Sequence, residues 1–496
     1  MSTRPAVRAS LRLLSRAVVR RVRHSGRSVA LPALRPGQAL PEALDTSDPA
    51  LVAAFNRVAA RLDSARRSLH VPGLSAALVY NQDTIWTGGF GLARRDREIP
   101  ADQHTIYHQG SIAKIFTNTM LMQLRDAGMV SLDDPIARYI PEVNKQSNDL
   151  GRLTLRQLAS HTSGLPTEAP LDYIKSTHFP SIDTVLASLS DVRLVAPPMK
   201  EFKYSNLGFA LLGHALERAA GQSYKEYVTE RILQPLGMVG SAFDPVPDQD
   251  DRVAGGYLPV QGNDPPASGR MFDAGAFVPA GAVWASVTDM ARFVSLQFWE
   301  GPAEENQILS VTSVREMHAP IMFIDPQWQS AIALGGALER VGNWGGMYAV
   351  GGVESFAAMI AYLPDLKLGM AVAMNTGVNP GPLVEGVLQE LIPIVTETLA
   401  RHQLARATVD PAVLQRYAGH YSWPGVAELD VRGQDGVLLM QTQLSDSEFI
   451  ASPVAEHAFR MEGGRLKGEV ATFEVDDSGR AIRLWIGNYP MDRVNG

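Results

Sequence analysis

The chain has 496 residues, of which 45% are hydrophobic and 20% charged, with 43 Gly and 32 Pro. This is the composition of a folded globular protein rather than of a disordered or collagen-like one. The chain contains no cysteine, which excludes a disulfide scaffold, a cysteine nucleophile and thiolate metal sites.

The net charge of −7 combines two very different segments. Residues 1–41 carry nine Arg and no Lys, Asp or Glu, whereas the rest of the chain carries 36 basic and 52 acidic residues, a net charge of −16. Because an acidic body repels a phosphate backbone, we expect no nucleic acid partner.

Residues 1–41 are predicted to form a basic leader or a disordered tail. From Leu11 to Arg23, Leu and Val recur at helical spacing while Arg occupies another face. An Arg-rich, acid-free amphipathic segment is typical of a transit peptide, which favours mitochondrial targeting; a cytoplasmic location is expected otherwise. A basic helix on an anionic membrane surface remains an alternative. No apolar run of about 18 residues occurs elsewhere, so we expect no transmembrane segment.

The pattern over residues 42–403 predicts one α+β domain. Helices are expected at residues 49–69, 111–127, 155–160, 206–220 and 286–298. Strands are expected at residues 75–79 and 84–86, and a central antiparallel hairpin at 356–362 and 369–374. Strands at both ends with helices between them indicate an antiparallel sheet flanked by helices.

Residues 404–496 are predicted to form a small, separate all-β module. Short strand patterns alternate there with turns, and Gly433–Gly436 and Asp476–Gly479 are hairpin signals. We expect this module to be appended to the first domain rather than to carry catalytic residues.

One pair of residues has the chemistry of an activated nucleophile. Ser111-Ile-Ala-Lys114 is the only Ser-x-x-Lys in the chain and opens a predicted helix. A serine hydroxyl needs a base or a nearby cation to attack a carbonyl, and residues three apart on a helix share one face. The helix N-terminus also offers a positive dipole end and a free N–H for an oxyanion. Alone, the pattern also fits a capping serine and a solvated lysine.

A second motif supplies a partner for this pair. Tyr204-Ser-Asn206 is the only Tyr-x-Asn and also precedes a predicted helix. A phenol near an ammonium loses its proton more easily, so Tyr204 is expected to act as general base toward Ser111 and then as acid toward the leaving group. The Asn206 amide can hold Lys114 or a substrate carbonyl. Tyr204 could instead be a half-buried packing residue.

Other catalytic patterns are absent from the sequence. There is no Gly-x-Ser-x-Gly and no His-Glu-x-x-His. His104 and His108, with Asp102 close by, match no metal motif. We therefore predict neither a metal nor an organic cofactor.

Together these motifs resemble the serine β-lactamase-related superfamily, in its class C-like branch of penicillin-binding proteins, D-aminopeptidases and ester hydrolases. The similarity covers roughly residues 50–400 and follows the chain order Tyr107–Lys114, Leu153–Pro166, Phe202–Gly208, Pro235–Met238 and Pro279–Ala282. The resemblance implies a β-lactamase/transpeptidase-like domain with an all-helical subdomain, followed by a small antiparallel β-barrel. It implies Ser111 as the acylated nucleophile, Lys114 as its activator and Tyr204 as the base.

The third motif of that superfamily departs from the usual pattern. Members usually carry Lys or His, any residue and then Gly on the strand beside the site, whereas Ala349-Val350-Gly351 aligns here. The missing cation helps relatives bind a substrate carboxylate, so β-lactams and carboxylate-terminated peptides are disfavoured as substrates.

Trp344-Gly-Gly346 offers an alternative alignment of the third motif, because it is similar to the signature of esterases in this superfamily. Trp344 could equally be a packed aromatic beside a glycine turn. A glycine in this region lets a substrate carbonyl approach a backbone N–H, and we favour Gly352, beside Gly351, as this second oxyanion donor.

The sequence therefore predicts a serine hydrolase that forms an acyl-enzyme on Ser111. The expected substrate is a small-molecule ester or amide, and a carboxylesterase acting on small esters is favoured. A D-aminopeptidase, an amidase or a β-lactamase-type hydrolase using the same site is the alternative. A scaffold or binding protein with a decayed site is an alternative of another class.

Overall fold

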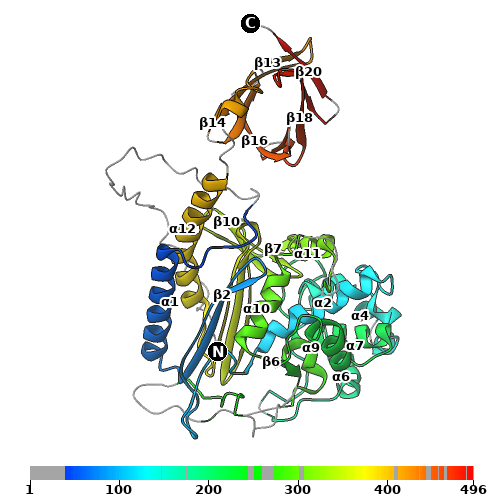
Figure 1. Ribbon diagram of the computed structural model, residues 1–496. Coiled ribbons are helices and arrows are strands. Elements are labelled where there is room, and N and C mark those ends of the chain that lie inside the picture. The colour runs from blue at the N-terminus through cyan, green and yellow to red at the C-terminus, as the bar shows by residue number, and fades with distance from the viewer. Residues whose placement is uncertain are drawn as a thin grey trace.

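The computed structural model describes residues 40–494 except for residues 147, 175, 244–250, 260–267, 269–272, 301–306, 407–410, 435, 443–447, 456, 463–465 and 488. The amphipathic helix predicted at Leu11–Arg23 lies outside the described residues. Two folded parts follow one another along the chain, a mixed α/β part and a β-barrel (Figure 1).

The first part is built on a nine-stranded antiparallel sheet. Its strands are β1 (Gly73–Tyr80), β2 (Asp83–Arg94), β3 (Ile99–Pro100), β7 (Met322–Phe323), β8 (Ser330–Ala333), β9 (Gly336–Val341), β10 (Trp344–Val353), β11 (Phe356–Leu363) and β12 (Leu368–Met374). Their order is β3-β2-β1-β12-β11-β10-β9-β8-β7. The predicted central hairpin is β11–β12, paired from Ala357↔Met374 to Leu363↔Leu368. Every residue of β1, β11 and β12 is buried because both faces of the sheet are covered, which explains their continuous apolar sequences.

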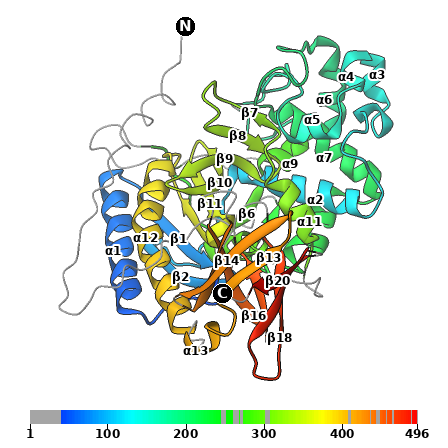
Figure 2. The same cartoon turned by 90° about the horizontal axis from the view of Figure 1, so that it is seen from above.

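Two long helices cover one face of this sheet. They are α1 (Pro49–Ser68) and α12 (Gly381–Arg406), which lie side by side in both views (Figures 1 and 2). The predicted apolar stripe of α1 is buried, since Leu51, Val58 and Leu62 have no exposed surface. Proline at the first position of α1 and the Asp48 side chain, which accepts from Ala50 N, fix where the helix begins.

Helices and short strands cover the opposite face and form a helical subdomain beside it (Figure 2). The helices are α2 (Ala113–Asp126), α3 (Glu142–Gln146), α4 (Asn148–Gly151), α5 (Leu155–Ala159), α6 (Ile182–Ser188), α7 (Asn206–Ala220), α8 (Tyr224–Val228), α9 (Val278–Gly281), α10 (Val287–Leu296) and α11 (Val311–Met317). The short strands β4 (Tyr107–His108), β5 (Ala242–Phe243) and β6 (Val283–Ala285) form a second sheet in the order β4-β6-β5. All five predicted helices are therefore present, with ends that differ from the predicted ones by at most two residues.

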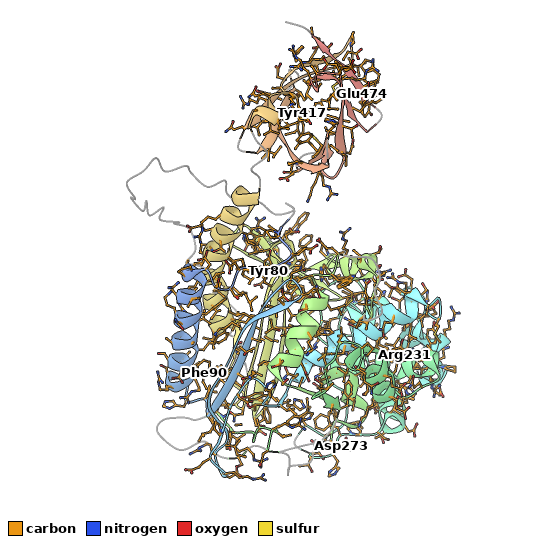
Figure 3. All side chains as sticks on the ribbon, in the orientation of Figure 1. Tyr80, Phe90, Arg231, Asp273, Tyr417 and Glu474 are labelled. Carbon is orange, nitrogen blue, oxygen red and sulfur yellow. The ribbon has the colours of Figure 1, made fainter. Side chains whose placement is uncertain are left out.

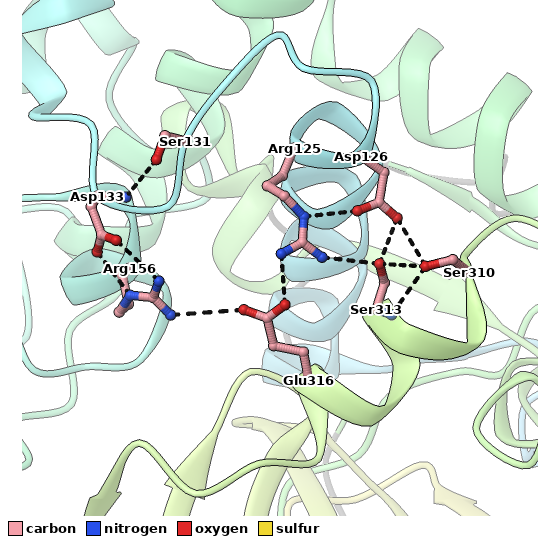
Figure 4. Close-up of polar contacts among 8 residues, drawn as sticks. All are labelled: Arg125, Asp126, Ser131, Asp133, Arg156, Ser310, Ser313 and Glu316. Atoms are coloured by element: carbon pink, nitrogen blue, oxygen red, sulfur yellow. Dashed lines mark hydrogen bonds and ion pairs between the residues drawn. The ribbon is translucent and has the colours of Figure 1, made fainter.

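A polar network fixes the C-terminal end of α2 (Figure 4). Arg125 donates to Glu316 Oε2 at 2.6 Å and to Ser313 Oγ at 2.9 Å, both on α11. Ser313 Oγ in turn donates to Asp126 Oδ2 at 2.5 Å. The partly exposed Arg125–Glu316 ion pair contributes little to stability alone. Together with the hydrogen bonds of Ser313, it holds α2 against α11. The orientation of α2 matters because Ser111 lies in the turn that leads directly into its other end.

The second part is a closed antiparallel barrel of eight strands. The strands are β13 (Gly419–Trp423), β14 (Ala427–Gln434), β15 (Val437–Thr442), β16 (Glu448–Ala455), β17 (Ala458–Met461), β18 (Val470–Val475), β19 (Ala481–Ile486) and β20 (Tyr489–Val494). Both predicted hairpins are present, as β14–β15 and β18–β19. Tyr417 (Figure 3) packs with Tyr421 and Phe473 in the barrel core. Closure removes the exposed sheet edges that otherwise promote aggregation.

The fold thus confirms the antiparallel sheet flanked by helices, the helical subdomain and the appended β-barrel that the sequence analysis expects. Within the described residues, no helix combines the length and the apolar character needed to cross a membrane.

Candidate active site

Ser111 lies where the chain enters α2 from the short strand β4. It belongs to a 3-10 turn, Gly110–Ile112, that continues directly into α2. Gly110 has φ +53, and a Cβ at Gly110 would lie 2.5 Å from the backbone nitrogen of Gly352. Only glycine fits this turn, because it tolerates the left-handed conformation and the close approach of β10. Ser111 is thereby placed at a helix N-terminus, facing the sheet.

Lys114 is buried, with 6% of its surface exposed, and its amine has three acceptors. The Nζ atom is 3.1 Å from Ser111 Oγ, 2.8 Å from Asn206 Oδ1 and 2.6 Å from the Ala280 carbonyl oxygen. Burial lowers the pKa of Lys114 to about 7, while the Glu168 carboxylate acts in the opposite direction. At neutral pH much of Lys114 is therefore an uncharged amine, whose lone pair can face the Ser111 hydroxyl.

Tyr204 contacts the same serine but is not ionised easily. Its hydroxyl donates to Ser111 Oγ at 2.7 Å, and Lys114 Nζ lies 4.8 Å from its ring centroid. Burial raises the pKa of Tyr204 to about 12; the hydrogen bond with Ser111 lowers it and the Glu168 charge raises it. The easier proton loss expected from the Lys114 ammonium is not found, because desolvation is the largest influence on the pKa of Tyr204.

His161 packs against Tyr204 from the loop that follows α5. The two ring centroids are 4.4 Å apart, and His161 Nδ1 accepts from the Ser205 backbone N–H at 3.1 Å. Burial holds the pKa of His161 well below its usual value, and the charges of Lys114 and Lys203 lower it further. His161 is thus a neutral side chain that orients the Tyr204 segment.

Asn206 connects Lys114 to a carboxylate that the sequence motifs did not mark. Its Oδ1 accepts from Lys114, and its Nδ2 donates to Glu168 Oε1 at 2.6 Å. The Tyr173 hydroxyl donates to Glu168 Oε2 at 2.6 Å. Glu168 lies in a loop, where no periodicity indicates the direction of a side chain, so only the tertiary contacts identify it.

Strand β10 brings Gly351 and Gly352 against the nucleophile turn. A Cβ at Gly351 would lie 1.8 Å from the Gln109 carbonyl oxygen and 2.9 Å from the Ser111 nitrogen, whereas a Cβ at Gly352 would meet only Phe356 O at 3.8 Å. Glycine at 351 therefore allows a contact between two backbones that no other residue permits. The N–H groups of Ser111 and Gly352 are the two candidate oxyanion donors at this contact.

Trp344 is not brought to the site. It is 3% exposed and packs with Tyr348 in the core between the sheet and helices α1 and α12. Trp344 lies at an even-numbered position of β10, whereas Ala349 and Val353 lie at odd-numbered ones. Ala349 and Val353 pack against the other core, on the face of the sheet nearer Ser111. Because side chains alternate along a strand, Trp344 points away from Ser111, which contradicts its assignment to substrate binding. Ala349-Val350-Gly351 is the segment that flanks Ser111.

A cavity of about 170 Å³ opens at Ser111, and Asn206, Glu168 and Gly352 also line it. Its apolar wall is formed by Ile174, Phe179, Phe277 and Val353, among others. A larger cavity of about 610 Å³ lies at the other end of α2, beside Gln123 and Arg231, and includes none of the predicted site residues. The smaller cavity contains the nucleophile Ser111, so it is the candidate substrate-binding cavity.

The fold and the Ser111–Lys114–Tyr204 cluster define the class, a serine hydrolase with the β-lactamase/transpeptidase architecture. A sequence model of the Beta-lactamase family matches residues 55–390. The chain is 31% identical over 405 residues to the human protein Putative beta-lactamase-like 1, across 77% of either chain. It is 28% identical over 296 residues to the D-alanyl-D-alanine-carboxypeptidase/endopeptidase AmpH of Escherichia coli K12, across 58% of this chain and 75% of that protein.

A solved structure supports the fold independently. The octameric penicillin-binding protein homologue from Pyrococcus abyssi matches with a TM-score of 0.61 and 23% identity, covering 88% of this chain and 99% of that one. The chain therefore belongs to the β-lactamase family.

Proposed function

We propose that this protein hydrolyses small esters through an acyl-enzyme formed on Ser111. The observation that carries the proposal is the pair of contacts to Ser111 Oγ, from the Tyr204 hydroxyl at 2.7 Å and from Lys114 Nζ at 3.1 Å. Of these two groups, Lys114 has the pKa nearer neutrality, at about 7. A general base works best when its pKa is close to the working pH.

In the acylation step, uncharged Lys114 takes the proton of Ser111 while Oγ attacks the substrate carbonyl. The Tyr204 hydroxyl, already a donor to Oγ, stabilises the negative charge that develops there. The N–H groups of Ser111 and Gly352 receive the oxyanion of the tetrahedral intermediate. Tyr204 then protonates the leaving oxygen and recovers a proton from Lys114, so that an alcohol departs and the acyl group stays on Ser111.

In the deacylation step, water takes the place of the alcohol. Tyr204 passes its proton to uncharged Lys114 and takes a proton from the attacking water, and the Lys114 ammonium then returns a proton to Ser111 Oγ as this oxygen leaves the acyl group. Asn206 Oδ1 and the Ala280 carbonyl hold the amine in place throughout, because they accept from Nζ at 2.8 and 2.6 Å. No metal or organic cofactor enters this proposal.

The character of the cavity supports an ester over a carboxylate-terminated peptide. Ala349 occupies the strand position where relatives carry a cation, and Glu168 adds a negative charge to the cavity. An alkoxide leaves more easily than an unprotonated amide nitrogen, so an ester makes the smaller demand on proton transfer to the leaving group.

Amide hydrolysis is the second candidate on the same residues. The Tyr204 hydroxyl stays protonated because burial raises its pKa to about 12, which suits a donor to an amine leaving group. The relative AmpH is named as a D-alanyl-D-alanine-carboxypeptidase/endopeptidase. In either case residues 42–403 are proposed as the catalytic domain, since the cavity lining is drawn from residues 110–353 and none of it from the barrel module at 404–496.

A hydrolysis panel tests the proposal. We would compare p-nitrophenyl butyrate, D-alanine p-nitroanilide and nitrocefin, each with the wild-type protein and with Ser111→Ala. The proposal expects the highest kcat/KM for the butyrate ester and its loss in Ser111→Ala. Faster turnover of the anilide would favour the amidase, faster turnover of nitrocefin a β-lactamase, and turnover of none by folded protein the scaffold alternative.

A further inference from the structure

Glu168 is a carboxylate in the Ser111 cavity that the proposed reaction steps do not use. Among the described residues that line the cavity, no other side chain carries a negative charge. Its two oxygens accept from Asn206 Nδ2 and from the Tyr173 hydroxyl, each at 2.6 Å. Both donors are uncharged, so within the described part of the chain Glu168 has no ion-pair partner.

Two lysines of the surrounding segments, Lys114 and Lys203, donate to groups other than Glu168. Lys114 Nζ lies on the far side of the Asn206 amide and donates to Ser111, Asn206 and Ala280. Lys203 Nζ donates to Thr167 Oγ1 at 2.6 Å and to the Tyr204 carbonyl oxygen at 3.4 Å. Glu168 is the charged side chain among the described residues that line the cavity, and burial lowers the pKa of Lys114 to about 7, so the positive charge that Lys114 sets against Glu168 falls as the pH rises through neutrality.

Keeping an unpaired carboxylate half-buried beside apolar walls costs free energy, since it has lost part of its hydration. Each oxygen of Glu168 has accepted one hydrogen bond and retains a lone pair for another. The neighbouring wall offers Ile174, Phe179 and Phe277 to the carbon skeleton of a ligand. A cationic group that enters the cavity would find the charge partner that the protein itself does not supply.

We propose that Glu168 is a specificity residue and that the preferred substrates are esters carrying an ammonium group close to the scissile bond. The inference rests on the proposed Ser111 hydrolase and adds the charge of its substrate. An anionic substrate is disfavoured by the same carboxylate and by the absence of a cation at Ala349.

The perturbation is Glu168→Gln, which removes the charge and keeps the shape. Gln Oε1 can still accept from Asn206, and Gln Nε2 can donate to the Tyr173 oxygen, so the position of Asn206 is preserved. Asp172→Asn is the matched control, because it removes the same charge from the same loop at an exposed position outside the cavity lining.

Two substrate pairs, each with a charged and a neutral member, locate the charge. On the acyl side we would compare D-alanine methyl ester with N-acetyl-D-alanine methyl ester at pH 7, where an α-amine with a pKa of about 7.7–8.0 is protonated. On the alcohol side we would compare butyrylcholine with 3,3-dimethylbutyl butyrate, which differ by one permanent charge. The measured quantity is the ratio of kcat/KM for the charged member to that for the neutral member.

The proposal expects the wild-type protein to prefer the charged member at least tenfold in one of the two pairs. Glu168→Gln should reduce that ratio at least tenfold, whereas Asp172→Asn should keep it within about twofold. In Glu168→Gln the acid limb of the pH profile for the neutral ester should also move to lower pH, because the charge that raises the pKa of Lys114 is gone.

A ratio near one in both pairs, or the same ratio in wild type and Glu168→Gln, would overturn the inference. Labelling with a fluorophosphonate probe separates this result from a failure of the hydrolase itself. Stoichiometric labelling of Ser111 without charge preference overturns only the role of Glu168. Absence of labelling in folded protein overturns the proposed hydrolase and the inference with it.

Discussion

Replacing Gly351 by alanine tests whether β10 must lie directly against the nucleophile turn. The added Cβ would lie 1.8 Å from Gln109 O and 2.9 Å from the Ser111 nitrogen. Neither atom belongs to a flexible side chain, so strand and turn must separate by more than about 1 Å, a displacement that can cost about 10²-fold in rate. Because the Gly352 N–H moves with the strand, the oxyanion also loses one donor, which costs about 10²–10³-fold in kcat.

The assay is kcat/KM for p-nitrophenyl butyrate, with thermal unfolding measured in parallel to show that the variant is folded. Gly345→Ala is the matched control, because Gly345 lies on the same strand and an added Cβ there has no atom within 4 Å. We expect a loss of about 10²-fold or more in Gly351→Ala and less than about threefold in the control. Gly351→Ala with near wild-type kcat/KM would refute the placement of the oxyanion donors at this contact.

Three further predictions concern the proton-transfer groups. Tyr204→Phe should lower kcat by about 10²-fold or more, since it removes a proton donor and acceptor; near wild-type ester turnover would rule that role out. The kcat/KM profile should rise with pH through about 7, because Lys114 must lose its proton to act as base; a limb near pH 4, as for an ordinary carboxylate, would exclude Lys114. The pKa of Lys114 is lowered from 10.5 to about 7, so the unfolded chain holds a proton that the folded chain gives up between these values. Relative to Lys114→Met, the unfolding free energy of wild type should therefore rise by about 3–4 kcal/mol from pH 7 to 10, as measured by urea denaturation; a constant difference would show that Lys114 is not desolvated.

Much of the fold followed from local patterns. The stripe of α1, the continuous apolar strands β11 and β12 and the two barrel hairpins are each specified by a few neighbouring residues, so period and turn chemistry predict them. Ser111, Lys114 and Asn206 also come together as their motifs suggested.

Other features depend on burial and on long-range contacts. The position of Tyr204 near the Lys114 ammonium suggests a lowered pKa, but the phenol packs against His161 and is largely desolvated, and burial raises its pKa instead. Trp344 and Gly351 both lie next to glycines on β10, so the local sequence does not distinguish them. They lie an odd number of positions apart along the strand, and Trp344 therefore faces α1 and α12 rather than Ser111. Glu168 reaches the site from a loop 38 residues before Asn206, a contact that no spacing rule encodes.

Acylation of Ser111 is the step on which the proposed hydrolysis depends. The most direct measurement is intact-protein mass spectrometry after a short reaction with a fluorophosphonate or a slow ester, followed by peptide mapping of the adduct. We predict one adduct per chain on the peptide that contains Ser111, abolished in Ser111→Ala and slowed in Lys114→Met. An adduct on another residue, or none in correctly folded protein, would contradict the proposed mechanism.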